Sequence, residues 1–128
     1  MNWRLERIEM AESDANPRIV NSGEVAWGPH PRFAGVQMKS LLTKGDNALA
    51  NVSMVLVPLG SEVGWHAHPA QVETVFVVRG HAMLTVGETD SELAPGCIVA
   101  IPMGAQHRLR NTGAESVELL ATFTPALN

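Results

Sequence analysis

Two separated blocks of glycine, proline, histidine and glutamate constrain this chain more than any other feature of its sequence. The first block holds Gly60, His66, His68, Glu73 and Gly80, and the second holds Gly96, Pro102, Gly104, His107 and Asn111. Glycine supplies the positive φ angles, and proline the fixed φ angle, that tight turns require. The blocks therefore predict short strands joined by tight turns, with three histidines and one glutamate among them.

The spacing of these side chains predicts that they meet at one centre. Side chains on a strand alternate between its two faces, so His66 and His68 lie on the same face. After a proline–alanine break, the β-branched and aromatic segment 72–78 returns as the partner strand and brings Glu73 beside them. His107 follows a second turn and opens a further strand, which a closed barrel would bring to the same centre. Three imidazoles and one carboxylate at one point indicate a metal site.

The two blocks resemble the conserved motifs of the cupin superfamily, and every motif residue is present. The stretch between them, residues 81–95, has the short length seen in small single-domain bacterial cupins, and the resemblance extends over residues 52–123. It implies an all-β fold, the cupin jelly-roll β-barrel, with metal ligands at His66, His68, Glu73 and His107. Some cupins keep this fold without a metal, and in that alternative the four side chains are simply hydrogen-bonded or solvated.

Short strand-like runs alternate with turn signals along most of the chain. The runs are 49–57, 72–78, 82–86, 97–101, 107–111 and 117–123. Such a rhythm is typical of an all-β sandwich or barrel, and helical periodicity is nearly absent. We therefore expect little helix, while the charged segment 1–12 leaves strand, helix and tail open. Asn111 opens a predicted hairpin turn, in which its side chain bonds the local backbone.

The chain is expected to form one domain, because 128 residues lie within the normal size of a folding unit. The barrel is predicted to span residues 46–128. Residues 1–45 form a predicted N-terminal arm that packs on the barrel or on a partner, with brief extended pieces at 18–20, 24–27 and 36–42. Because the arms of small cupins often add a strand to a neighbouring subunit's sheet, the resemblance suggests a homodimer.

Composition excludes several kinds of partner. Hydrophobic residues make up 45% of the chain, and the net charge is −4 with scattered basic residues, which excludes a nucleic-acid footprint. No stretch approaches the roughly 20 apolar residues that span a bilayer, and the first residues lack the apolar segment of a secretory signal. We expect a cytoplasmic protein without membrane contact. The lone Cys97 is expected to be buried, and Arg108 and Arg110, which alternate with His107, to lie on the outer face.

The predicted ligands restrict the identity of the metal to a group of transition metals but do not select one of them. Three imidazoles and one carboxylate suit Fe(II), Mn(II), Ni(II), Co(II), Cu(II) or Zn(II), whereas calcium and magnesium prefer oxygen ligands. Four protein ligands leave two open positions on an octahedral ion, where water, a bidentate substrate or dioxygen can bind. We therefore expect one divalent transition metal per chain and a small-molecule ligand.

Dioxygenase-type chemistry on a small organic molecule is the favoured function. A non-redox isomerase or lyase is the first alternative, in which a substrate carbonyl is polarised at the metal and Glu73 moves a proton as the base. A non-catalytic cupin that binds a small ligand or a metal is the second alternative. The fold alone does not choose among them, because cupins host many unrelated chemistries.

Alternation along the strands also predicts the wall of the barrel. Val75 and Val77 share a face with Glu73, and Leu109 and Asn111 share one with His107, so the inner wall is expected to be mostly apolar. Trp65, Met54, Met83 and Phe123 are candidates for the barrel mouth, with core packing as the alternative for each. No lysine or arginine falls on the inner face beside the ligands, which disfavours a phosphorylated sugar as the ligand.

Two histidines lie outside the blocks. His81 follows Gly80 and His30 lies between two prolines, so both are expected in surface turns. His30 has a second interpretation, in which the arm folds over the barrel mouth and this imidazole serves as an acid or base. The chain has no tyrosine, which removes one common cavity acid.

Overall fold

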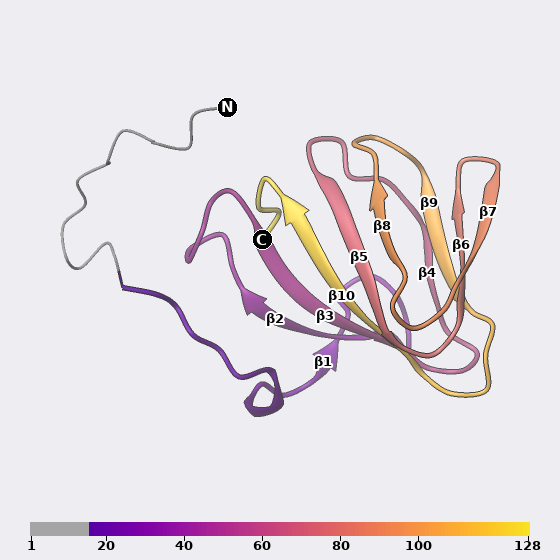
Figure 1. Cartoon of the computed structure of the whole chain (residues 1–128), viewed down its shortest axis with the longest axis horizontal. Coiled ribbons are helices and arrows are strands. Elements are labelled where there is room, and N and C mark those ends of the chain that lie inside the picture. Colours follow the sequence, from indigo (N-terminus) through magenta and orange to yellow (C-terminus); the bar gives the residue numbers. More distant parts are fainter. Residues whose placement is uncertain (1–15) are drawn as a thin grey trace.

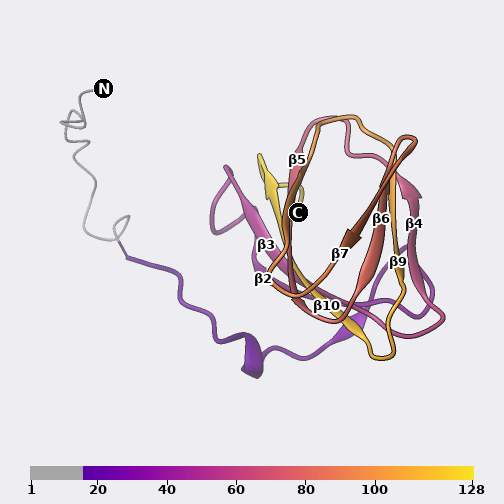
Figure 2. The same ribbon diagram turned by 45° about the vertical axis from the view of Figure 1, so that its right-hand side comes forward.

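Two antiparallel β-sheets face each other across an apolar interior in the computed structural model, which describes residues 16–128 (Figure 1). Within that range the larger sheet has six strands in the order β1-β2-β3-β10-β5-β8, and the smaller has four in the order β4-β9-β6-β7. When the molecule is turned, the two sheets are seen to curve around the interior (Figure 2). The prediction of an all-β fold is therefore confirmed.

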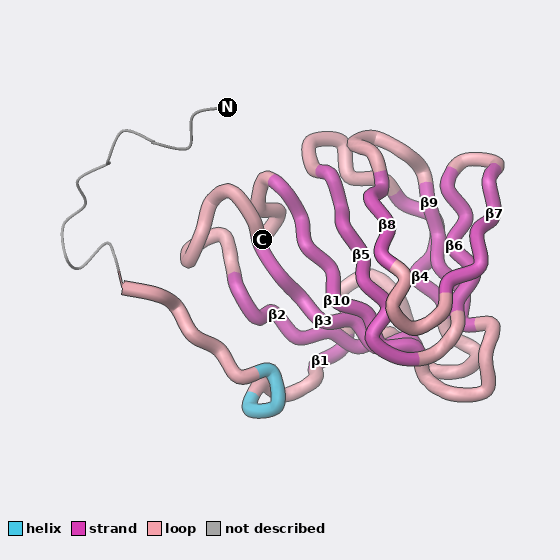
Figure 3. Tube along the Cα trace, viewed as in Figure 1, coloured by secondary structure: helices cyan, strands magenta, loops and turns pink. Residues whose placement is uncertain are grey.

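The strands are short and evenly spread along the chain (Figure 3). Their bounds are β1 (Gly28–Pro29), β2 (Gln37–Leu42), β3 (Asn51–Val57), β4 (Glu62–His66), β5 (Val72–Arg79), β6 (Ala82–Val86), β7 (Thr89–Leu93), β8 (Ile98–Ile101), β9 (His107–Asn111) and β10 (Val117–Thr124). A single 3₁₀ helix, η2 (Ser22–Glu24), accompanies them within residues 16–128. No helix in that range is long and apolar enough to cross a membrane. The segment 1–12, whose structure the sequence leaves open, lies outside the described residues.

The predicted strand runs are confirmed, with ends that shift by at most two residues. Strands β6 and β9 match the predicted runs 82–86 and 107–111 without change. Strand β7 is absent from the prediction because its residues are polar. It forms the outer edge of the smaller sheet, where Leu93 is its one buried residue, so it carries no apolar alternation to detect.

The segment before the barrel contributes strands to the larger sheet. Strand β2 pairs with β3, and the two residues of β1 pair with β2. The extended piece predicted at 24–27 begins one residue late, because Glu24 ends η2, where the side chain of Asn21 accepts a hydrogen bond from the amide of Gly23, and Val25 is the first extended residue. Residues 16–27 extend away from the barrel in both views (Figures 1 and 2).

Apolar side chains from both sheets fill the interior. Val57, Val77 and Val117 of the larger sheet have no exposed area, and Leu84 and Leu109 meet them from the smaller sheet. Fully burying a side chain of this size contributes roughly 1.5–3 kcal/mol to stability. Cys97, predicted to be buried, is only partly buried, because it lies in the turn before β8 and its sulfur faces the amide of Ala94.

A one-residue irregularity in β4 decides which side chains point inward. Val63 pairs with Leu109, but the next register pair joins His66 to His107, so β4 contains one extra residue between the two pairs. Such a bulge reverses the alternation of faces beyond it. His66 therefore points inward, while Trp65 lies on the outer face with its ring under the guanidinium of Arg108, 5.1 Å from the ring centroid. The proposed place of Trp65 at the barrel mouth is wrong for this reason.

Asn111 ties two strand ends together. Its side-chain amide donates to the carbonyls of Val57 and Glu115, and its side-chain oxygen accepts from the amide of Gly113. The predicted bonding to local backbone is thus confirmed. Alternation also predicted that Asn111 shares the inward face of His107, and its bond to Val57 of the opposite sheet agrees with this, although Asn111 does not line the cavity beside the cluster.

The motif glycines occupy turns with positive φ angles. Gly60, Gly80, Gly96 and Gly104 all have φ between 77° and 92°. Gly80 is additionally crowded, since a Cβ atom there would lie 2.8 Å from the main-chain oxygen of Ser116 and 2.9 Å from Cα of Val117. At Gly96 no atom of the described residues lies within 4 Å of the same position. Substitution at Gly96 would therefore cause backbone strain alone, whereas substitution at Gly80 would cause both backbone strain and steric overlap.

Replacing Gly80 with alanine is expected to destabilise the fold more than replacing Gly96 does. Both variants carry the cost of a left-handed backbone, roughly 1–2 kcal/mol, but only Gly80→Ala adds overlap with backbone atoms, on the order of 1–3 kcal/mol. Urea unfolding of the two variants and the wild type measures the difference. Equal losses for Gly80→Ala and Gly96→Ala would contradict the packing at Ser116.

Candidate metal centre

The four predicted ligand side chains come together inside one end of the barrel. His66 lies at the end of β4, His68 just after it, Glu73 in β5 and His107 at the start of β9. One donor atom from each residue lies within 4.8 Å of the other three. His66 and His107 are buried, and His68 and Glu73 are partly buried. The sequence thus places all four side chains of the cluster correctly.

Strand pairing positions these side chains. The bulge in β4 sets His66 directly across from His107 on β9. Glu73 enters from the opposite sheet, where β5 places it between Phe123 on β10 and Ile101 on β8. The cluster therefore bridges the two sheets at the point where they converge.

Main-chain carbonyls fix the tautomers of two imidazoles. Nδ1 of His66 lies 2.7 Å from the carbonyl oxygen of Gly64, and Nδ1 of His107 lies 2.9 Å from that of Ala105. A carbonyl oxygen can only accept, so both Nδ1 atoms carry the proton and donate it. In the neutral rings Nε2 then carries the lone pair, and these atoms face the cluster. This is the tautomer in which a histidine binds a metal through Nε2.

The remaining polar atoms of the cluster fit a divalent ion. Nε2 of His68 is buried without a hydrogen-bond partner among residues 16–128, and Oε1 of Glu73 lies 3.7 Å from it. The same Oε1 lies 3.2 Å from Nε2 of His107. Donor atoms bound to one ion at about 2.0–2.2 Å lie at most about 4.4 Å apart, so the observed set needs only a small contraction. An ion would also satisfy the unpaired His68 nitrogen.

Aromatic side chains flank the histidines on two sides. Phe123 of β10 meets the ring of His68 edge-on, with centroids 4.7 Å apart. Phe33, in the loop between β1 and β2, lies 5.2 Å from the ring of His66, and His30 lies 4.9 Å from Phe33. Phe123 is thus at the site, as suggested from the sequence. Met54 and Met83 alternate with the inward residues of β3 and β6 and lie on the outer face, so their suggested place at the mouth is wrong.

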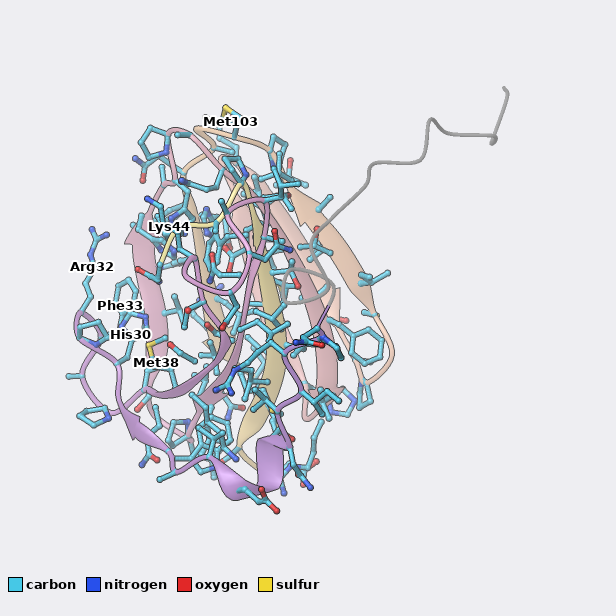
Figure 4. The ribbon with its side chains drawn as sticks, turned by 90° about the vertical axis from the view of Figure 1, so that its left-hand side faces the viewer. His30, Arg32, Phe33, Met38, Lys44 and Met103 are labelled. Atoms are coloured by element: carbon cyan, nitrogen blue, oxygen red, sulfur yellow. The ribbon has the colours of Figure 1, made fainter. Side chains whose placement is uncertain are left out.

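The loop between β1 and β2 reaches the site, and no sequence signal identified Phe33 or Arg32 there. The imidazole Nδ1 of His30 accepts from the amides of Arg32 and Phe33, which holds the loop in a compact turn. His30, Arg32 and Phe33 gather on one side of the barrel, with the Arg32 side chain extending outward (Figure 4). His30 is therefore an indirect neighbour of the cluster, separated from His66 by the ring of Phe33. His81, by contrast, lies exposed in the turn after Gly80, as expected.

A small apolar cavity of about 50 Å³ adjoins the cluster. His66, Glu73 and His107 line it on one side, and apolar side chains line the rest, among them Val55, Val63, Val75, Leu109, Leu119 and Ala121. Within residues 16–128 no lysine or arginine lines this cavity. The prediction of an apolar inner wall is confirmed, although Val77 lies in the packed core below the cavity and does not line it.

Comparison with known families agrees with this architecture. The family model described as Cupin domain matches residues 53–123, more than half of the chain. The chain belongs to the cupin family. The match spans both blocks of conserved spacing and the whole four-residue cluster.

Several curated proteins are similar to this cupin. The uncharacterized protein SCO3923 of Streptomyces coelicolor is 38% identical over 56 residues, which cover 44% of this chain and 52% of that protein. The cupin thus spans about half the length of SCO3923. Protein SchB of Streptomyces halstedii is 29% identical over 118 residues, covering 91% of this chain and 82% of SchB. Polyketide synthase CurC of Streptomyces cyaneus is 26% identical, covering 85% of this chain and 70% of CurC.

Solved structures share the fold of this cupin. A predicted oxalate decarboxylase of Thermotoga maritima superposes with a TM-score of 0.77 at 25% identity, covering 84% of this chain and 99% of that protein. The polyketide cyclase RemF of Streptomyces resistomycificus superposes with a TM-score of 0.72 at 18% identity, covering 84% of this chain and 78% of RemF. The second likeness concerns the fold alone.

Burial is the largest influence on the pKa of each imidazole in the cluster. Burial lowers the pKa of His66 to about 4, and the neighbouring His107 and His68 act in the same direction. Burial also lowers the pKa of His68, against the opposing charge of Glu73. Burial also lowers the pKa of His107. Hydrogen bonds with Glu73 and Ala105, together with the charge of Glu73, outweigh burial, so the pKa of His107 is raised. His66 and His68 are therefore neutral near pH 7, whereas His107 is the ring that holds a proton most readily.

Metal binding by this cupin is expected to release a proton from His107. Because the pKa of His107 is raised above its usual 6.5, a proton competes with the metal below that pKa, and the affinity for Zn(II) should increase as the pH rises through it. Calorimetric titration at pH 6.5 and pH 8.5, each in two buffers of different ionisation enthalpy, measures protons released per ion.

Release should be larger at pH 6.5 than at pH 8.5. His81→Ala, which removes an exposed imidazole outside the cluster, is the control and should leave this difference unchanged. A release that is equal at both pH values would contradict the contact between His107 and Glu73.

Proposed function

We propose that this cupin binds one divalent transition metal through His66, His68, Glu73 and His107, and that it is a metal-dependent enzyme acting on a small organic molecule. One observation carries the proposal: four donor atoms converge within 4.8 Å, and one of them, Nε2 of His68, is buried without a partner. A polar atom buried in this way costs about 1–3 kcal/mol unless something binds it. A bound ion removes that cost.

The donor set and the cavity together favour a small carbonyl compound as the substrate. A bound ion would supply Lewis-acid chemistry at the positions that the four side chains leave open. Two oxygens of one molecule, such as those of a 1,3-dicarbonyl or its enolate, match two adjacent open positions. Within the described residues no lysine or arginine lines the cavity, which disfavours a phosphate group inside the cavity itself.

Glu73 is the residue proposed to move a proton. Its Oε1 is held between Nε2 of His107 and Nε2 of His68, at 3.2 and 3.7 Å. A carboxylate at the edge of an apolar cavity would be placed to take a proton from a carbon next to a substrate carbonyl. The surrounding Val, Leu and Ile side chains exclude water, which strengthens charge interactions at that point.

Non-redox carbon chemistry, such as cyclisation, decarboxylation or isomerisation, is the first candidate reaction. Its support is that similar proteins carry the names polyketide synthase CurC and predicted oxalate decarboxylase. Polyketide chains and oxalate both present neighbouring oxygens that can chelate a metal. A dioxygenase, the reaction favoured by the sequence, is the second candidate. The dry apolar cavity beside the ligands favours it, because an apolar space suits a small apolar gas.

The test is turnover of a defined panel by protein reconstituted separately with Zn(II), Mn(II), Ni(II) and Fe(II). The panel contains 1,3-diketones, poly-β-carbonyl thioesters, oxalate and catechols, each assayed with and without oxygen. Product formed anaerobically with Zn(II) or Mn(II) supports the non-redox reaction, and oxygen uptake with Fe(II) supports the dioxygenase. Stoichiometric metal without turnover of any panel member would overturn the proposal of an enzyme acting on these compounds.

Removing a ligand is expected to abolish stoichiometric metal binding while leaving the barrel folded. His66→Ala and His107→Ala each delete a donor that faces the cluster, so affinity for Zn(II) should fall by at least about 100-fold, more than changes in supporting residues cause. Elemental analysis gives the occupancy and circular dichroism gives the fold. His81→Ala is the matched control and should bind like the wild type. Full occupancy in either ligand variant would refute the four-ligand site.

We also propose that the protein forms a homodimer through the outer face of the larger sheet. Ile98, Phe76, Leu120 and Met54 lie side by side on β8, β5, β10 and β3 and form an apolar row across this face. Ile98 is 68% exposed and Phe76 38% exposed. The arm offers a second apolar contact, because Ile19, on the segment that extends from the barrel, is 81% exposed. A second copy of the chain, which presents the same row and the same arm, is the proposed occupant.

Charge on this row is expected to dissociate the dimer. Ile98→Lys would place two lysines at the interface, whereas Leu59→Lys introduces the same charge at an exposed apolar site in the turn between β3 and β4. Light scattering after gel filtration should give a dimer for the wild type and Leu59→Lys and a monomer for Ile98→Lys. A monomeric wild type at micromolar concentration would rule the interface out.

A further inference from the structure

We infer that the cavity beside the ligand cluster is a binding site for a small apolar molecule or group of two or three heavy atoms. The volume of this cavity, about 50 Å³, leaves the body of an organic substrate outside it. The inference rests on the cavity itself, and only its consequence for turnover rests on the proposed function.

The chemistry of the wall decides what the cavity can hold. Among the residues that the structure describes, the polar side chains that line it are those of His66, Glu73 and His107, which also form one edge of the four-residue cluster. The other lining side chains are aliphatic and come from both sheets. A buried water needs two to four polar partners, and apolar cavities without them stay dry. Nδ1 of His66 and Nδ1 of His107 already bond main-chain carbonyls, and Nε2 of His107 bonds Glu73. The described part of the wall therefore offers a water few free partners even without a metal.

The size of the cavity sets an upper limit on its occupant. Its volume is about 50 Å³, whereas pockets that enclose a whole organic ligand measure roughly 300–1,000 Å³. One water requires at least about 10–15 Å³ on the same measure. The space therefore accepts a diatomic gas, a xenon atom or a short alkyl group, and excludes the body of a substrate.

The ligands separate this cavity from the flanking aromatic side chains. His66, Glu73 and His107 line the cavity, but His68 does not. The ring of His68 instead meets Phe123, and Phe33 covers the ring of His66 from the loop between β1 and β2. An occupant of the cavity would therefore reach the reacting centre from the interior of the barrel. The substrate body would lie on the side of His68.

Two sources could supply such an occupant. One is a dissolved apolar gas, of which dioxygen is the reactive example. The other is a methyl or ethyl group at the end of a substrate that is held at the metal. Both occupants are small and apolar. They differ in the kinetic constant that filling the cavity would change.

Ala121 offers a direct way to fill the cavity. It lies on β10 between Ser53 of β3 and Val75 of β5, is 2% exposed and lines the cavity. Ala121→Val would place two additional methyl groups in the space. Ala100→Val is the matched control, because Ala100 lies on β8 of the same sheet with its side chain exposed.

Xenon binding tests the site without any need for metal or activity. Crystals of the wild-type protein and ¹²⁹Xe spectra in solution, each under xenon pressure, should show one xenon in the cavity. Ala100→Val should retain this xenon, and Ala121→Val should lose most of its occupancy. Ordered water in the cavity, or no xenon in the wild type, would overturn the inference. The wild-type result stands even if Ala121→Val does not fold.

Kinetics of the metal-loaded enzyme with a substrate found in the panel then separate the two sources. If the occupant is dioxygen, Ala121→Val should raise KM for oxygen and leave the preference among substrates unchanged. If it is a substrate group, Ala121→Val should favour the homologue shorter by one methylene, by about tenfold in kcat/KM. Loss of xenon with neither kinetic change would refute a role for the cavity in turnover. A failure to find any turnover would concern the proposed function and leave the xenon result intact.

Discussion

The antiparallel pairing of β4 with β9 is the contact on which the site depends. It joins the first block of the chain to the second within the smaller sheet. The extra residue between Val63 and His66 changes the phase of β4 at this point. Without that residue the alternation begun at Val63 would turn Trp65 inward and His66 outward. A local irregularity of the backbone therefore determines which aromatic ring reaches the metal centre.

The cluster also places polar side chains inside an apolar interior. Glu73, His66 and His107 are removed from water by the same Val and Leu side chains that stabilise the barrel. Nε2 of the neighbouring His68 is buried without a hydrogen-bond partner among residues 16–128. An unpaired buried atom costs stability, and a ligand that bound it in the folded chain alone would return that stability by mass action.

The cluster could be predicted from the sequence because the signals that place its residues lie close to them in the chain. Turn glycines, alternating strands and the two blocks place His66, His68, Glu73 and His107 without any knowledge of long-range contacts. Prediction from the sequence failed where the outcome depends on such contacts. The face of Trp65 follows from a bulge that no residue type marks, and Phe33 reaches His66 through a loop whose path is set by packing. The polar edge strand β7 escaped detection because an edge needs no apolar alternation.

Two of the ligand histidines take their orientation from the backbone, each through the carbonyl two residues earlier in the chain, at Gly64 and Ala105. A main-chain carbonyl is present whatever side chain the residue carries. Mutations around the cluster can therefore accumulate in the wall of the barrel without rotating these imidazoles. The orientation of these two imidazoles and the shape of the cavity beside them can thus change independently of each other.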